Sequence, residues 1–148
     1  MTANLEGNLD ALLARIDDGS VAYWATLGIV VDGVDAVGRV RLSLPMRPAL
    51  GTRRPDVMHG GAIASLIDAA AGAAVLTLRE EGDESWTGQA TLDMNVSFLA
   101  AAFNDIRAEA TVLRSTRTLA FVGIDVRDAD GALLAVGRAT YAIMRGSR

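Results

Sequence analysis

Residues 60–78 read GGAIASLIDAAAGAAVLTL, and this stretch decides the fold. Its strongest apolar stripe recurs at the spacing of one helix face and consists of Ile63, Leu66, Ile67, Ala70, Ala74 and Leu78. The remaining positions are mostly alanine and glycine, so the other faces are also small and apolar. A helix that is apolar all round is one that protein or lipid surrounds. We therefore predict a long buried helix from about residue 60 to residue 79.

One charged residue, Asp68, lies in the middle of this stretch. The length alone would permit a membrane span. A carboxylate in mid-span would cost about 2.5–3.5 kcal/mol, however, and the stretch is rich in alanine and glycine rather than leucine and phenylalanine. We interpret the helix as buried in protein and expect no membrane partner.

The residues before this helix predict a shorter helix and two strands. Residues 8–19 place leucine and isoleucine at helical spacing and end at a glycine. Residues 23–31 alternate and are followed by Asp-Gly, which predicts a strand and a hairpin turn. The return strand covers residues 39–44, and a loop rich in proline and arginine follows at residues 45–58.

Four alternating strands are predicted after the long helix, at residues 90–98, 105–112, 118–127 and 133–144. In the first of them, we expect the even-numbered side chains to face inward and the odd-numbered ones to face outward. The inward set is Ala90, Leu92, Met94, Val96 and Phe98, and the outward set is Thr91, Asp93, Asn95 and Ser97. Asp130-Gly131 predicts the last hairpin turn.

This order of elements predicts an α+β fold in which one antiparallel six-stranded sheet wraps round one long central helix, the hotdog fold. The length fits a single domain over residues 1–148. One sheet leaves part of so apolar a helix uncovered, which indicates a homodimer or a dimer of dimers.

The composition excludes several classes of function. The net charge of −4 gives no general attraction to nucleic acid or to anionic membranes. The absence of cysteine excludes disulfides, thiolate nucleophiles and cysteine-based zinc sites, and a single histidine supplies no usual metal ligand set. The N-terminus carries acids and no apolar core, so we expect no signal peptide and a cytoplasmic protein.

The single histidine, His59, directly precedes Gly60 and Gly61 at the start of the long helix. The free N–H groups of a first helical turn favour developing negative charge, and glycines let a carbonyl approach the backbone closely. These three residues therefore fit an oxyanion hole. They fit equally well a histidine that caps the helix and a tight entry turn.

Asp68 is the sharper indication of chemistry. Burial is costly for a lone carboxylate and suits it to general-base work. The alternatives are an aspartate that faces a wet groove or one bonded to Ser65. Roughly 13 Å of helix separates His59 from Asp68, so the two residues cannot serve one carbonyl within one chain. Across a two-fold axis between antiparallel helices, Asp68 of one chain could approach Gly61 of the other.

Three runs resemble a known family: HGGAIASLIDAAAGAAV, TLDMNVSFLAAA and RSTRTLAFVGIDVRDADGALLAVGRATYAI. Together they resemble the phenylacetate-degradation type of hotdog thioesterases over roughly residues 20–145. The resemblance implies that the Gly61 N–H polarises a thioester carbonyl and that Asp68 of the neighbouring subunit activates water or attacks. It further implies that the hydroxyl of Thr91 helps to position the water or the acid.

The same resemblance implies that coenzyme A binds at a turn and at the end of a strand, namely at Arg114, Ser115, Arg117, Thr118, Phe98 and Leu99. Guanidinium groups suit phosphate geometry, although arginine at an exposed turn is also common. Arg47, Arg53 and Arg54 form a second candidate set. The chain departs from the family where an asparagine usually precedes the histidine and where Arg-Pro usually follows Phe-Leu.

The sequence thus predicts an acyl-CoA thioesterase with no metal or redox cofactor, in which coenzyme A enters only as part of the substrate. The alternative is a non-catalytic hotdog protein that binds acyl-CoA. A dehydratase is a weaker third possibility, because it would need a histidine placed as the base.

Overall fold

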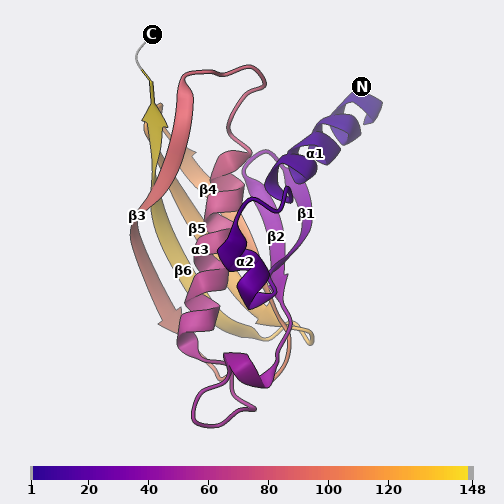
Figure 1. The fold of residues 1–148 in the computed structure, drawn as a ribbon, viewed down its shortest axis with the longest axis vertical. Coiled ribbons are helices and arrows are strands. Elements are labelled where there is room, and N and C mark those ends of the chain that lie inside the picture. Colours follow the sequence, from indigo (N-terminus) through magenta and orange to yellow (C-terminus); the bar gives the residue numbers. More distant parts are fainter. Residues whose placement is uncertain (1, 147–148) are drawn as a thin grey trace.

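The computed structural model describes residues 2–146 and has four helical and six strand elements in that part of the chain (Figure 1). The helical elements are α1 (Thr2–Ile16), α2 (Ala22–Leu27), the short 3₁₀ turn η1 (Pro48–Leu50) and α3 (Gly60–Leu76). The strands are β1 (Val30–Ala36), β2 (Arg39–Leu44), β3 (Trp86–Phe98), β4 (Ile106–Ser115), β5 (Leu119–Asp128) and β6 (Leu133–Arg145).

The six strands form one sheet in the order β1-β2-β4-β5-β6-β3, and every neighbouring pair is antiparallel. Helix α3 packs along one face of this sheet, and α2 lies over α3 on the side away from the strands (Figure 1). The predicted α+β hotdog architecture is confirmed. Among the described residues, no helix is long and apolar enough to cross a membrane.

Helix α3 forms the centre of the core, as its apolar composition predicts. Leu66 and Ile67 are fully buried, and ten of the seventeen residues of the helix are buried. Gly137 on β6 lets the helix approach the sheet, because a Cβ there would lie 2.8 Å from Ile67 Cγ2. The helix ends at Leu76 rather than Arg79, since the Thr77 hydroxyl donates to the Ala74 carbonyl and accepts the Gly38 N–H.

The predicted strand over residues 23–31 is wrong, because residues 22–27 form helix α2. Gly28 ends this helix in the left-handed conformation, with its N–H donating to the carbonyls of Trp24 and Ala25. Strand β1 begins only at Val30, and the hairpin turn lies at Gly38, where φ is +82°. The Asp-Gly pair at residues 32–33 instead lies inside β1 at an irregularity in the β1–β2 register.

The predicted alternation of β3 is also wrong in part. The β3–β6 register shifts between Thr91 and Asp93, which marks a bulge. Before the bulge, the Thr91 side chain points at α3, and Leu92 at the bulge is 60% exposed. Beyond it, Met94 and Val96 pack against the core as predicted. Two other predicted inward residues are exposed: Ala90 and Phe98.

The other predicted elements are present, with shifts of a few residues at their ends. The N-terminal helix ends at Ile16 rather than residue 19, where Gly19 has φ of +73°. Strands β4, β5 and β6 cover the predicted ranges, and Gly131 adopts a positive φ in the last turn. Strand β3 has a single neighbour, β6, so its other edge is free in the isolated chain.

Candidate active site

The histidine at the start of α3 acts as a helix cap in this structure. His59 has extended backbone angles, and its Nδ1 accepts the N–H of Gly61 at 2.8 Å. A neutral ring that accepts at Nδ1 carries its proton on Nε2. A side chain at position 61 would crowd this ring, because a Cβ there would lie 2.9 Å from Nδ1. The capping interpretation of His59 therefore holds, and it occupies the N–H that the resemblance assigned to the substrate.

The other N–H groups of the first turn divide into two kinds. Those of Ala62 and Ile63 donate to the His59 carbonyl at 2.9 and 3.3 Å. Within residues 2–146, the N–H of Gly60 donates to no atom. The turn thus offers one open donor at Gly60 and a second at Gly61 that a ligand oxygen could take over from His59.

Asp68 lies two turns along α3 and is held by two hydroxyl groups. Its Oδ1 accepts from Thr91 Oγ1 at 2.7 Å and from Tyr141 Oη at 2.6 Å. The side chain is partly exposed rather than fully buried as predicted. The alternative of a bond from Asp68 to Ser65 is wrong, because Ser65 Oγ donates to the Gly61 carbonyl and pairs with the Tyr23 hydroxyl. The structure therefore brings Thr91 to Asp68 as the resemblance implied.

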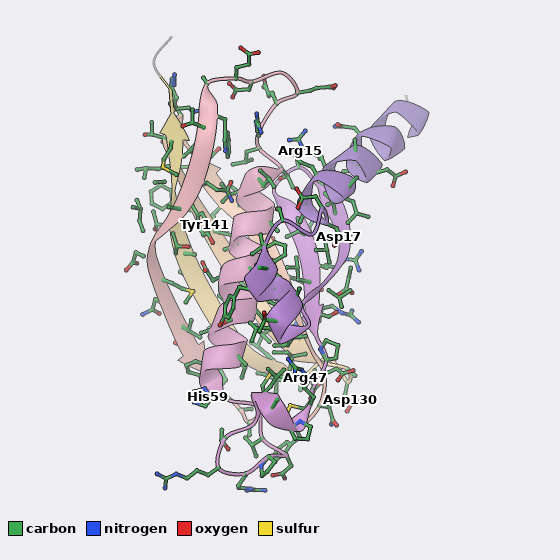
Figure 2. All side chains as sticks on the ribbon, in the orientation of Figure 1. Arg15, Asp17, Arg47, His59, Asp130 and Tyr141 are labelled. Atoms are coloured by element: carbon green, nitrogen blue, oxygen red, sulfur yellow. The ribbon has the colours of Figure 1, made fainter. Side chains whose placement is uncertain are left out.

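Tyr141 is a site residue that sequence reasoning missed. It lies on β6 opposite Thr91, is 5% exposed and also approaches the Asp68 carbonyl at 2.8 Å (Figure 2). Burial raises the pKa of the Tyr141 phenol well above its usual value, and the bond to Asp68 adds to this effect, so the group stays a donor. Gly72 makes room for it, because a Cβ at that position would lie 2.9 Å from the phenol oxygen.

The Asp68 carboxylate borders a hollow of about 320 Å³. The hollow lies between α3 and the segment that joins α1 to α2, and Thr91, Tyr141 and Gln89 line it on the strand side. Both hydroxyl groups bind Oδ1, so Oδ2 is the oxygen left for a ligand or water. A carboxylate with one oxygen fixed and the other available is suited to taking a proton from water or to attacking a carbonyl.

The predicted coenzyme A residues fall into two separate groups. Phe98 and Leu99 line a hollow of about 410 Å³ with Gly60 at the N-terminal end of α3, and both are more than half exposed. The turn that holds Arg114, Ser115, Arg117 and Thr118 lies at the other end, where Arg117 borders a hollow with Leu78. Helix rise separates these ends by about 24 Å, so one chain does not bring the two groups together.

The second set of arginines is divided between structural and exposed positions. Arg47 donates to the carbonyls of Thr26 and Leu27 at 2.7 and 3.3 Å and so holds the C-terminal end of α2 (Figure 2). Arg54 pairs with Asp56 at 3.1 Å, and Arg53 is exposed. Arg47 is therefore engaged within the chain rather than available to a phosphate.

Comparison with known proteins identifies the family. The family model of the thioesterase superfamily matches residues 56–135, which include α3 and the strands β3, β4 and β5. A candidate esterase of Halobacterium salinarum is 34% identical over 137 residues, and the match covers 87% of each chain.

The chain belongs to the thioesterase superfamily. This thioesterase is also similar to solved structures. A thioesterase family protein from Silicibacter pomeroyi has 27% identity and a TM-score of 0.79, and the match covers 91% of this chain and 99% of that one. The E. coli PaaI protein from the phenylacetic acid degradation operon has 17% identity and a TM-score of 0.79, covers 94% and 98%, and shows the likeness of fold alone. The predicted family and enzyme class, a thioester hydrolase, are confirmed.

Proposed function

We propose that this thioesterase hydrolyses acyl-CoA to a free acid and coenzyme A, with no metal or redox cofactor. The observation that supports this best is the Asp68 carboxylate, which two hydroxyl groups orient beside a hollow. Asp68 Oδ2 takes a proton from water, the water oxygen bonds to the acyl carbon, the carbon–sulfur bond breaks and the proton passes to the thiolate. Direct attack by Oδ2, followed by hydrolysis of the anhydride, would use the same geometry.

The N-terminal end of α3 supplies the site for the thioester oxygen. A developing oxyanion is favoured by the helix dipole and by the N–H groups of Gly60 and Gly61. In this structure, His59 Nδ1 accepts the Gly61 N–H. We propose that the thioester oxygen replaces Nδ1 as the acceptor, with the His59 ring turning away on its own side-chain torsions.

The two halves of this site come from two subunits. Strand β3 has thirteen residues and a free edge, with Leu92 60% exposed beside it. A long free strand edge is a template for pairing with another chain. Antiparallel pairing of two β3 strands about a two-fold axis would continue the sheet and set the two α3 helices side by side in opposite directions. Asp68 of one subunit would then face Gly61 of the other, in a homodimer or a dimer of dimers.

The same arrangement accounts for the divided coenzyme A residues. Antiparallel α3 helices bring the Arg114–Arg117 turn of one subunit toward the Gly61 end of the other. We expect replacement of Arg114 and Arg117 by alanine to raise KM for acyl-CoA much more than it lowers kcat. The effect should shrink for a pantetheine thioester that lacks the nucleotide phosphates. Equal effects on both substrates would show that these arginines serve structure instead.

A thioester panel tests the proposed function. Wild-type protein should release coenzyme A, detected by its free thiol, from at least one of acetyl-, hexanoyl-, phenylacetyl- and dodecanoyl-CoA. The background signal of the thiol assay is low because the protein has no cysteine. Binding of acyl-CoA without any release of thiol would contradict hydrolysis and support the non-catalytic alternative.

We also propose a cytoplasmic location, with which the lack of cysteine accords.

Tyr141→Phe tests how the carboxylate is held. The variant keeps the ring but removes one of the two donors to Asp68 Oδ1. Loss of a hydrogen bond to a charged group should lower kcat about tenfold, with KM little changed. An unaltered kcat would show that the phenol only fills space.

A further inference from the structure

The hollow beside Asp68 extends along α3 toward the C-terminal end of the helix. Its floor consists of small residues at successive turns, Ala69, Gly72 and Ala73, and it reaches Leu76. Eight residues of helix separate Asp68 from Leu76, which corresponds to about 12 Å. The opposite wall comes from the N-terminal part of the chain and consists of Ile16, Val21 and Trp24. Asp18 and Ser20 at its rim are exposed, and Arg15 is held by a hydrogen bond to the Arg79 carbonyl at 2.8 Å. A largely apolar space thus begins at the carboxylate and ends within two turns.

Gln89, which lines the hollow, has one buried polar atom without a partner in the part of the chain that the structure describes. Gln89 Nε2 donates to the Gly72 carbonyl at 2.8 Å, while Gln89 Oε1 is buried and accepts no hydrogen bond. A buried acceptor without a partner is costly in free energy. Because this oxygen has no exposed surface, the case for a ligand in the hollow rests on the lining residues alone.

Helix α2 covers this hollow without belonging to the core. None of its six residues is buried, and it is held by side-chain hydrogen bonds at both ends. Tyr23 pairs with Ser65 at 2.9 Å, and Arg47 donates to the carbonyls of Thr26 and Leu27. Trp24 is the large residue that α2 contributes to the hollow. Trp24 and Leu27 pack against the core but are only partly buried, so we expect substitutions on α2 to leave the core intact.

We propose that this hollow holds the acyl group of the substrate, and that Trp24 sets the largest acyl group that the enzyme hydrolyses. This inference rests on the proposed function. The acyl carbon must lie near Asp68 Oδ2. The rest of the acyl group then lies in the hollow along α3. Within one chain, Trp24 and Leu76 border the hollow within two turns of Asp68. The substrate class is therefore a compact apolar acyl group, a medium straight chain or a single ring, rather than a long-chain fatty acyl group.

Two variants change the hollow in opposite directions. Trp24→Ala should open the space above α3, so that the ratio of kcat/KM for dodecanoyl-CoA to that for hexanoyl-CoA rises at least about tenfold. Val21→Phe adds volume at a position that is 40% exposed, so the core is not strained. It should lower kcat/KM for hexanoyl- and phenylacetyl-CoA and leave acetyl-CoA little changed. Phe121→Ala is the matched control, because Phe121 is 39% exposed on the opposite face of the sheet.

The outcomes separate this inference from the proposed function. If the wild-type enzyme hydrolyses no thioester of the panel, the proposed function fails. If wild type is active but both hollow variants keep its order of acyl preference, as the Phe121 control should, the acyl pocket lies elsewhere and the inference is overturned. If circular dichroism shows that Trp24→Ala does not fold, Val21→Phe alone tests the inference, since an exposed valine contributes little to the stability of the fold.

Discussion

Replacing Asp68 by asparagine should lower kcat for a CoA thioester at least about 100-fold. Asparagine keeps the size and still accepts hydrogen bonds from Thr91 and Tyr141 at its amide oxygen, but it cannot take a proton or attack. The variant should fold normally, and its free energy of unfolding should hold or rise, because a partly buried charge has been removed. Steady-state kinetics and thermal unfolding measure the two effects.

Asp130→Asn is the matched control for this variant. Asp130 lies in the exposed turn between β5 and β6 and does not line the hollow, so removal of its charge should leave kcat unchanged (Figure 2). Turnover that survives in Asp68→Asn at the wild-type rate would exclude this carboxylate as base or nucleophile.

Gly61→Pro should lower kcat by about 10²–10³, the loss observed when one oxyanion donor is removed. Proline deletes the N–H that His59 Nδ1 accepts in this structure. Gly61 is the second residue of α3, and the first turn of a helix tolerates proline, so the fold should survive. Circular dichroism and the released-thiol assay measure the two properties.

Gly61→Ala separates the N–H from the glycine itself. Alanine keeps the donor, and its Cβ would meet only the His59 ring, at 2.9 Å from Nδ1, which can rotate away. Most of the turnover should therefore remain. If alanine is as inactive as proline, lost space at position 61 is enough to explain the proline result, and the prediction for the N–H fails.

The central helix and its sheet could be predicted because buried elements have apolar residues at a regular spacing in the sequence. An apolar helix with small residues on every face, such as residues 60–76, fits few places other than the centre of a domain. The prediction was wrong where a local backbone feature, a glycine or a bulge, outweighed the alternating pattern. Gly28 ends a helix that the pattern of residues 23–31 suggested as a strand, and one extra residue at Leu92 turns Thr91 toward α3.

The relative positions of site residues on the helix could be predicted from the sequence, but those of site residues on different strands could not. Helical spacing correctly separates His59 from Asp68, because rise per residue is constant. It gives no information on which strand residue faces Asp68, since that depends on the β3–β6 register. Tyr141 was missed for this reason. The alternating pattern of β6 indicates only that Tyr141 belongs to the core, and the pairing of β6 with β3 at Thr91 is what brings its hydroxyl to Asp68. The cap that His59 forms was one of two interpretations left open.

The measurement that tests the account most directly mixes two inactive variants, Asp68→Asn and Gly61→Pro, and lets their subunits exchange. A mixed dimer has one site with Gly61 from the first variant and Asp68 from the second, while its other site has neither. If half the dimers are mixed and each has one working site of two, about a quarter of the wild-type activity should return. Native mass spectrometry, which resolves the two variants by mass, verifies the exchange. Proven exchange with no recovery of activity would contradict a site shared between subunits.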